Sequence, residues 1–590
     1  MKLSGRTFIV LWLSYSILLI IMRWNNIVTH TGDDTDDTLR MVQLRDFLNG
    51  QSWFDVTQYR MNAPQGAPMH WSRLIELPLA FFVLLFTPIF GQPVAEMISS
   101  TIVPLITMGI AVYSIAQVTA KLASPQAAMV AVIIAFSSIG FMTQFRPMRI
   151  DHHGWQIAMA CVSLYTVMWR NKKRAGIAMG LAMAIWTHIS LEGLPLTAAF
   201  FVLLGWHWVF GKSESRQLFW AISSFVLGSF ALFLGTQTHG LLAPVYCDTI
   251  STPHIAAIVC AAAIMLPAIY SAPEDWRIRL VVAIVAGAAA AATLLLLAPQ
   301  CANGAFGSLD PIVRTYWFEN ISEGLPIWDL GWEEFLILYT APLLSIILAF
   351  ILWQRGMIAR TTEMSAMIFF MLCSFGMSLF VFRAISLASI FAVPLIAIAI
   401  TTFFQFYRDS KVPFHRIGLV ALMLFISAPG IFSILIYTIV ESKPDTAITK
   451  ANEKADVENT ICESVESIAA LAKLPISRID VPLDLGPMVL LTTPHSVLAS
   501  NHHRNQMAMR DHIQIYRLAP QLSREIIRRH GINYIAICPN TAEMTLYEKN
   551  DRRGLWATLK SGHKLDWIER LPDMGKGIHV WRVKPNLKDT

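Results

Sequence analysis

The chain has 590 residues, of which 55% are hydrophobic and only 15% are charged, and its mean hydropathy is +0.50. This composition excludes an ordinary soluble domain and indicates a membrane protein with many spans. The net charge of +6 is small for this length, so nothing favours a nucleic-acid partner. The seven cysteines show no CxxC spacing, which excludes a zinc-finger or iron–sulfur protein.

Apolar runs long enough to cross roughly 30 Å of hydrocarbon predict about thirteen transmembrane helices. The first run follows Lys2 and Arg6 as in a signal peptide, but no small-residue cleavage site follows, so we expect a retained helix. Lys and Arg cluster at alternate connections, as in RNKKR (170–174), and such clusters stay in the cytoplasm. We therefore predict a multi-pass protein of the cell inner (plasma) membrane. Its transmembrane domain is 1–440, with outward-facing loops at 23–93 and 299–334.

The first outer loop begins with GDDTDDTLR (32–40), which places four carboxylates within five residues directly after the first span. Acidic residues beside a span are costly unless they sit in water, pair with cations or hold a metal, and they often mark function. The alternative is a loop whose acids are merely solvated. The cluster is thus a candidate site for metal binding or catalysis.

A second polar segment, FRPMRIDHHGWQ (145–156), follows the third span and places Asp151, His152 and His153 in one turn. Carboxylate and imidazole are common ligands of Mn and Zn, whereas Mg prefers carboxylate and water. Two uses of this turn stay open. The three residues form a metal site, or Asp151 caps the next helix and the histidines form hydrogen bonds at the membrane interface.

Two further outer features follow along the chain. The loop 299–334 contains Glu319 and Glu323 among aromatic residues, a combination found in carbohydrate sites, although it also suits a polar cap over the outer domain. Arg383 is a single cation in an otherwise apolar run. It either snorkels to the lipid headgroups or binds a lipid phosphate through its two-pronged guanidinium.

The composition changes from about residue 441, where charge density rises and hydrophobic runs shorten to strand length. We therefore predict an outer, periplasmic α/β domain over 441–590. Cys462 and Cys538 both lie in it, so a disulfide between them is an open alternative to two buried thiols. The segment 500–512 (SNHHRNQMAMRDH) is rich in His and Arg.

Taken together and in this order, these parts resemble the catalytic subunit of oligosaccharyltransferase, a member of the GT-C class of integral membrane glycosyltransferases. GDDTDDTLR resembles the family's G-x-D-x5-R signature. The match assigns the metal-binding, catalytic aspartate to Asp34, with Asp36 and Asp37 as alternatives if the loop is shifted. The resemblance covers about residues 1–440 and implies a GT-C fold.

The later motifs are also similar to those of this family. Asp151 and His153 match the DHH that supplies metal ligands in archaeal members. NISEGLP (320–326) resembles the fifth-loop motif whose glutamate acts on the acceptor side, here Glu323. FRAISLASIFAVPL resembles the segment whose arginine contacts the donor diphosphate, here Arg383.

The resemblance implies metal-assisted transfer, with Mn or Mg, of a sugar or oligosaccharide from a polyprenyl phosphate or diphosphate at the outer face of the membrane. The family's WWDYG motif, which reads the protein sequon, is missing, and PLDLG (482–486) is only a faint match. A basic surface suits an anionic glycolipid or glycan better than a peptide. We therefore predict a non-protein acceptor, with Glu319, His503 and Arg504 on the acceptor side.

Four other functions compete with this one. A protein-glycosylating oligosaccharyltransferase uses the same donor chemistry. A ligase or polymerase of surface polysaccharide also uses lipid-linked glycans, but many such ligases need no metal. A secondary transporter would place ionisable residues near the bilayer midplane and show repeated halves, whereas the spans here are apolar and the acids cluster outside them. A non-catalytic receptor or assembly subunit would not need the carboxylates.

Overall fold

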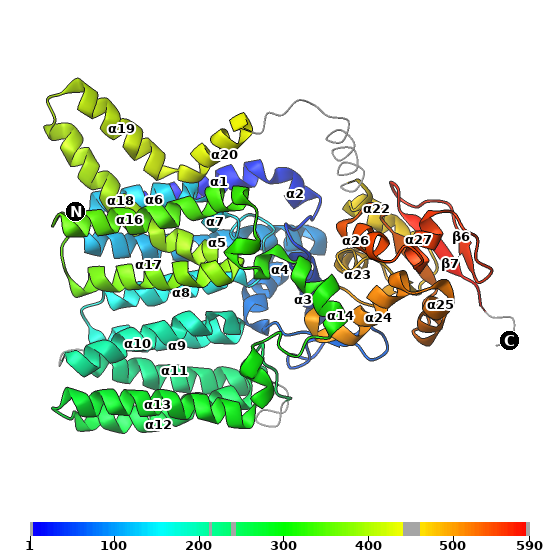
Figure 1. The fold of residues 1–590 in the computed structure, drawn as a ribbon, viewed down its shortest axis with the longest axis horizontal. Coiled ribbons are helices and arrows are strands. Elements are labelled where there is room, and N and C mark those ends of the chain that lie inside the picture. The colour runs from blue at the N-terminus through cyan, green and yellow to red at the C-terminus, as the bar shows by residue number, and fades with distance from the viewer. Residues whose placement is uncertain (1–3, 212–214, 238–243, 441–460, 586–590) are drawn as a thin grey trace. The chain divides into compact units, whose positions relative to one another are not determined.

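The computed structural model describes residues 4–211, 215–237, 244–440 and 461–585, and the chain divides into two compact units (Figure 1). The helical unit comprises Met1–Trp24, Trp71–Ser308 and Ser322–Ser442. The mixed unit comprises Asn25–His70, Leu309–Ile321 and Lys443–Thr590. Each unit is thus assembled from segments that lie far apart in the sequence.

The helical unit is a bundle of long apolar helices (Figure 1). Ten helices within the described residues are long and apolar enough to cross a membrane, some of them with a short 3₁₀ or π extension. They contain α1 (Gly5–Met22), α4 (Glu76–Phe90), α5 (Gln92–Leu122), α10 (Leu194–Phe210), α11 (Ser215–Thr236), α12 (Thr252–Ser271), α13 (Trp276–Leu297), α16 (Thr340–Gln354), α17 (Thr362–Phe380) and α18 (Ile385–Asp409). The fold class predicted from composition, a polytopic helical membrane protein, is confirmed.

These ten helices do not test the predicted number of about thirteen spans. The bent pair α19 (Pro413–Ser427) and α20 (Pro429–Val440) raises the number in the described chain to at most eleven. Three further bundle helices, α6 (Pro125–Ser137), α8 (His153–Val167) and α9 (Lys172–Ile189), are shorter or less apolar. A helix inside a bundle needs less apolar surface than one facing lipid, because its polar groups contact other helices. Thirteen stays a prediction.

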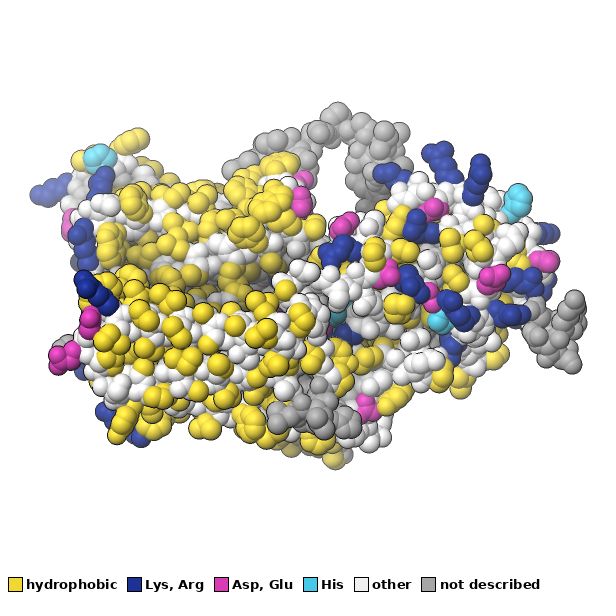
Figure 2. Space-filling view, turned by 60° about the horizontal axis from the view of Figure 1, so that its bottom comes forward, with side chains coloured by type: hydrophobic (Ala, Val, Ile, Leu, Met, Phe, Trp, Pro, Cys, Tyr) yellow, Lys and Arg dark blue, Asp and Glu magenta, His cyan; other side chains and the backbone are white. Residues whose placement is uncertain are grey.

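The surface of the helical unit fits a lipid environment. Figure 2 shows hydrophobic side chains spread over its sides and Lys and Arg side chains gathered at one end. Its most enclosed helix is α18, in which every side chain from Ile385 to Ala399 is buried. A helix that is apolar on all sides packs at the centre of a bundle. Arg383 stands directly before this helix, in the 3₁₀ turn η9 (Phe382–Ala384).

Short elements connect the bundle helices. They are α2 (Trp24–Val28), η1 (Arg73–Ile75), α7 (Ile139–Met142), η2 (Leu191–Gly193), η4 (Pro299–Asn303), η6 (Ser322–Gly324), η7 (Ile327–Asp329), α15 (Trp332–Glu334) and the π-helix η8 (Phe335–Tyr339). A disulfide between Cys247 and Cys301 joins the α11–α12 connection to η4. Of these connections, η2 carries Glu192 and η6 carries Glu323.

The mixed unit is built on a five-stranded sheet with strand order β4-β3-β5-β7-β6, which confirms the predicted C-terminal α/β region. Strand β3 (Arg478–Asp480) runs parallel to β4 (Ser496–Val497) and β5 (Tyr534–Ile537), and β7 (His579–Val583) is antiparallel to β5 and β6 (Ile568–Arg570). Helices cover it: α22 (Val465–Ala469), η10 (Ala470–Lys473), α23 (Gly486–Thr492), η11 (His503–Asn505), α24 (Gln506–Arg517), α25 (Pro520–Arg529), α26 (Ala542–Asn550) and α27 (Leu555–Lys560). Cys462 and Cys538 form a disulfide.

Two outer-loop segments are integral parts of the mixed unit. The first contributes α3 (Thr35–Leu48) and the strand pair β1 (Thr57–Gln58) and β2 (Ala67–Pro68), and Met61 forms a parallel bridge with Val497 of β4. The second contributes α14 (Pro311–Tyr316) and η5 (Phe318–Asn320), whose apolar side chains pack in the core of the unit. Both segments therefore belong to the unit, and the second one contributes to its apolar core.

Candidate functional site

The predicted DHH turn lies between α7 and the start of α8. Asp151 is buried, and its two carboxylate oxygens have different partners. Oδ1 accepts the backbone N–H of His153 at 2.9 Å, while Oδ2 lies 2.8 Å from Nη2 of Arg149. This hydrogen bond satisfies the first N–H of α8, whose N-cap residue is His152 and not Asp151. It occupies one oxygen only, and the other faces the charged groups of the site.

Burial alone would raise the pKa of the Asp151 carboxyl, but the charges of Arg149, His153 and His152 and the backbone hydrogen bond outweigh it. The pKa lies well below its usual range as a result. Asp151 is thus ionised at any physiological pH. A buried carboxylate that stays ionised can bind a cation without first losing a proton.

Glu323 approaches the same turn from η6. Its Oε1 lies 3.9 Å from Arg149 Nη2, its Oε2 lies 4.0 Å from His153 Nε2, and its side chain is 36% exposed. The helical unit therefore brings together three of the predicted site residues, Asp151, His153 and Glu323. Arg149 belongs to the same cluster although the sequence analysis did not select it.

Two pairs of ligand atoms in this cluster are each close enough to share one divalent ion. Two ligand atoms that each lie about 2.1 Å from an ion are at most about 4.2 Å apart. The Asp151 Oδ2 to His153 Nε2 distance is 3.9 Å, and the His153 Nε2 to Glu323 Oε2 distance is 4.0 Å. An ion here would share the Asp151 carboxylate with the guanidinium of Arg149. Ligand atoms of Asp151, His152 and His153 also lie within 4.8 Å of one another.

Arg383 is connected to this cluster through two side chains. Its Nη1 lies 2.8 Å from Oε1 of Glu192 in η2, and Oε2 of Glu192 accepts a hydrogen bond of 3.2 Å from Gln156 Nε2. The same Nε2 lies 3.4 Å from His153 Nδ1. A continuous polar path thus runs from the predicted phosphate-binding arginine to the predicted metal ligands.

The loop that holds Glu323 is also attached to the turn that holds Arg383. The backbone N–H of Phe382 donates to the carbonyl of Leu325 at 3.0 Å. No motif in the sequence points to Arg149, Gln156 or Glu192. Glu192 had a usable signal, because it is a carboxylate at the start of an otherwise apolar span, where ionisable residues are often functional.

The first-loop acids shape the start of α3. Asp34 is its N-cap, with Oδ1 accepting the N–H of Asp36 at 3.2 Å, while Asp37 Oδ2 accepts the N–H of Asp34 at 3.2 Å. Asp37 is buried. This capping box gives two of the acids a structural role. Asp34 belongs to the mixed unit and Asp151 to the helical unit, so a shared metal site stays a prediction.

The predicted acceptor-side residues lie in the mixed unit. Glu319 is exposed in η5. Arg504 Nη1 donates to the carbonyl of Met69 at 2.9 Å, and the ring of His503 lies 4.8 Å from that of His70. The basic segment is therefore attached to the end of the first-loop segment. Its role toward an acceptor stays a prediction.

A second charged cluster lies in the core of the mixed unit. The buried His512 contacts Asp480 through Nδ1 and Glu543 through Nε2, each at 2.8 Å. Burial lowers the pKa of His512, but the two carboxylates outweigh it and raise this pKa to about 10. Nearby Asp484, in PLDLG, has a pKa raised to about 7 by burial and then by Glu543, Asp34 and Glu463.

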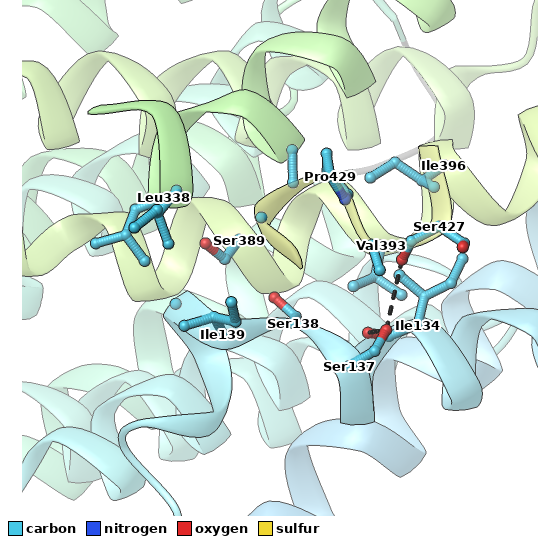
Figure 3. Close-up of a pocket in the computed structure, with 15 residues that line it drawn as sticks. Ile134, Ser137, Ser138, Ile139, Leu338, Ser389, Val393, Ile396, Ser427 and Pro429 are labelled. Carbon is cyan, nitrogen blue, oxygen red and sulfur yellow. Dashed lines mark hydrogen bonds between the residues drawn. The ribbon is translucent and has the colours of Figure 1, made fainter. Parts of the chain in front are cut away.

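A small uncharged hollow of about 30 Å³ lies elsewhere in the helical unit, where α6, α7, η8, α18 and the α19–α20 bend meet. Figure 3 shows that Ser137, Ser138, Ser389 and Ser427 supply its polar groups, and Ser137 Oγ lies 3.4 Å from the Ser427 carbonyl. No charged side chain lines it. The ionisable chemistry of this unit is therefore at the DHH turn and not in this hollow.

Neither a protein-family model nor a curated protein sequence matches the chain. Solved structures do. The archaeal oligosaccharyltransferase AglB from Archaeoglobus fulgidus, in complex with an inhibitory peptide and a dolichol-phosphate, is 13% identical with a TM-score of 0.65, over 92% of this chain and 72% of that one. The oligosaccharyltransferase of the same organism in complex with Zn and sulfate is 14% identical with a TM-score of 0.59, over 92% and 70%.

The mycobacterial arabinofuranosyltransferase AftD, as the R1389S mutant, is 12% identical with a TM-score of 0.50, over 99% of this chain and 42% of that one. At these identities the likeness is one of fold. The chain therefore has the GT-C fold of integral membrane glycosyltransferases, as the motifs of the sequence predict.

Proposed function

We propose that this protein is a membrane glycosyltransferase that moves a sugar or oligosaccharide from a polyprenyl phosphate or diphosphate carrier to an acceptor at the outer face of the membrane. The observation that supports it most is the path from Glu323 through His153, Gln156 and Glu192 to Arg383. It places candidate metal ligands and a candidate phosphate-binding arginine side by side in one unit. A fold shared with solved glycosyltransferases agrees with this.

Arg383 would bind the phosphate of the carrier. A guanidinium binds phosphate through two parallel hydrogen bonds and keeps its charge at any physiological pH. Glu192, 2.8 Å away, orients the guanidinium before the donor arrives. The turn η9 is also attached to the Glu323 loop through the Phe382 N–H. A movement of Arg383 on donor binding would therefore change the position of Glu323.

Asp151, His153 and Glu323 would hold a divalent metal, with Asp34 as the predicted fourth ligand. The mixture of carboxylates and imidazole suits Mn, while Mg would rely on the carboxylates and water. When bound, such an ion supplies Lewis-acid stabilisation of the departing phosphate. The protein's own part is to keep Asp151 ionised through Arg149 and to bring Glu323 to the turn.

The acceptor is activated, in this proposal, by a first-loop carboxylate. Asp34 or Asp36 would act as a general base or orient the acceptor hydroxyl, because neither is fully buried, whereas Asp37 is enclosed in the capping box. A glycolipid or glycan acceptor remains the first choice, given the missing WWDYG motif and the basic 500–512 segment. A peptide acceptor is the second choice, since the similar archaeal enzyme binds an inhibitory peptide.

The two disulfides support an outer location for the loops. Cys301, Cys462 and Cys538 lie in segments that the predicted topology places outside the cytoplasm, and Cys247 is bonded to Cys301. Disulfides persist in oxidising compartments such as the periplasm and are rare in the cytosol. This agrees with a multi-pass protein whose site and C-terminal domain face outward.

The deciding experiment supplies the purified full-length protein in nanodiscs with labelled lipid-linked glycans extracted from its own host. The expected result is labelled product in the glycolipid or glycan fraction, lost on chelation and restored by Mn or Mg. Label in Asn-linked peptides instead would establish the peptide acceptor. Two control samples are run under the same conditions, namely membranes of the host and membranes of a host that lacks the gene. The proposal is wrong if the purified protein labels no fraction while both membrane samples transfer the label equally well.

A further inference from the structure

Three histidines converge in the mixed unit from two segments that are distant in the sequence. His70 ends the first-loop segment, soon after β2, while His502 is the N-cap residue of η11 and His503 its first residue. Their candidate ligand nitrogens all lie within 4.8 Å of one another, and His70 Nδ1 lies 2.8 Å from His502 Nε2. The ring centroids are 4.9, 4.8 and 5.1 Å apart. We call this group the histidine cluster.

The backbone on both sides of the cluster is fixed by other contacts. Next to His70, the Met69 carbonyl accepts from Arg504. On the other side, the His502 N–H donates to the Ser500 carbonyl at 2.7 Å, and the Asn505 N–H donates to the His502 carbonyl at 2.9 Å. His502 is buried. The three rings are thus brought together by the fold and lose little further freedom when a ligand binds.

The ligand type follows from the chemistry of the rings. Neutral imidazole binds Zn²⁺, Cu²⁺, Ni²⁺ and Co²⁺, whereas Mg²⁺ and Ca²⁺ prefer oxygen ligands, and none of the three cluster residues is a carboxylate. Nitrogens bound to one tetrahedral Zn²⁺ at about 2.05 Å lie about 3.3 Å apart. The pair at 2.8 Å would separate by a few tenths of an ångström, and the wider separations would close. Three protein nitrogens leave one position for water or another ligand.

We propose that His70, His502 and His503 bind a transition-metal ion of the Zn²⁺ class, which fastens the end of the first-loop segment to the C-terminal part of the mixed unit. The ion would cross-link residues 432 positions apart in the sequence. This site is separate in residues and chemistry from the proposed catalytic set, whose ligands are mainly carboxylates. In this proposal His503 is a metal ligand, and Arg504 is the basic residue left on the predicted acceptor side.

The test measures metal binding and stability in the full-length protein in nanodiscs. After chelation, Zn²⁺ is titrated in competition with a chromophoric chelator, and Co²⁺ is used as a visible spectroscopic probe. We expect Zn²⁺ binding whose affinity falls by more than about 100-fold in His70→Gln and in His503→Gln. That exceeds the 10- to 100-fold loss typical of a residue that only orients a ligand. Co²⁺ should give a tetrahedral spectrum with nitrogen ligands.

Two controls separate this site from others. His563→Gln changes an exposed histidine of the same unit and should keep the ion, and Asp151→Asn alters only the proposed catalytic set and should also keep it. Zn²⁺ should raise the Tm of the wild-type protein but not of His503→Gln, while the metal-free Tm values agree. Equal Zn²⁺ affinity in the wild type and in His70→Gln/His503→Gln would overturn the proposal, as would the absence of Zn²⁺ binding in the wild type.

Discussion

Each unit buries a histidine among carboxylates, yet the two clusters are built differently. In the mixed unit His512 contacts Asp480 and Glu543 directly, both at 2.8 Å. In the helical unit His153 lies 3.9 and 4.0 Å from its carboxylates, too far for hydrogen bonds, and the Glu323 side chain is partly exposed. In the first arrangement both ring nitrogens of the histidine are occupied by direct carboxylate contacts. The second leaves room between the histidine and its carboxylates for a ligand, which is what distinguishes a candidate site from a structural network.

The largest expected effect is on the helical-unit cluster. Asp151→Asn should abolish transfer, because it removes the carboxylate at the centre of the proposed set. It should also lower stability by about 3 to 5 kcal/mol, since Arg149 loses the partner of a buried ion pair. Assays of labelled product and of Tm in nanodiscs measure the two effects.

The double variant Arg149→Met/Asp151→Asn separates these effects, because it removes both charges. We expect it to recover most of the Tm and none of the activity. If the double variant regains transfer together with stability, Asp151 only supports the fold. The DHH cluster of the helical unit would then be a structural network, like the His512 cluster of the mixed unit.

In the mixed unit the same kind of change should affect stability alone. His512→Gln leaves Asp480 and Glu543 buried without their cation and should cost about 3 to 5 kcal/mol. Because folding raises the His512 pKa from its ordinary 6.5 to about 10, its stabilisation is complete below pH 6.5 and is lost as the pH rises toward 10.

Thermal unfolding measured between pH 6 and 10 tests this. The Tm of the wild type should fall across that range, and that of His512→Gln should change much less. At a temperature where the variant is folded, its donor KM and kcat should equal those of the wild type. A changed kcat there would assign His512 to the catalytic machinery and remove the contrast between the units.

A variant of Arg383 tests the proposed donor site of the helical unit. Arg383→Leu should weaken donor binding by about 2 to 5 kcal/mol, the usual cost of deleting one partner of a desolvated charge pair, and appear mainly in the donor KM. Lys should rescue in part, because it keeps the charge but lacks the two-pronged geometry. Arg355→Leu, an exposed arginine of the same unit, is the matched control. An unchanged donor KM in Arg383→Leu would mean that this arginine only contacts headgroups.

The smallest expected effect concerns Asp484. Its pKa rises from the ordinary 3.8 to about 7 on folding, so the folded state favours the protonated form and stability falls as the pH rises from about 4 to 7. Asp484→Asn should remove this slope and raise stability at pH 8 by at most a few kcal/mol. Tm is measured from pH 4 to 8, because the Asp484 effect on stability occurs at about pH 4 to 7, whereas that of His512 occurs above pH 6.5. A profile identical to that of the wild type would show that Asp484 is ionised throughout.

The sequence by itself determined the membrane class, the apolar spans, the change to an α/β region near residue 441 and the DHH turn. These follow from local properties, since hydropathy, charge density and strand length are read within a short window. Asp151 and His153 could be selected together because they stand two positions apart. Glu323 and Arg383 were selected from motifs, each by itself.

Only the tertiary structure decided which of these residues meet. It brings Glu323 to His153 and links Arg383 to Gln156 through Glu192, because helices far apart in the chain pack side by side in the bundle. It also makes the first outer loop part of the mixed unit, so that His70 reaches His502. Such partners are fixed by the packing of buried surfaces from many helices, which no local pattern of one sequence specifies.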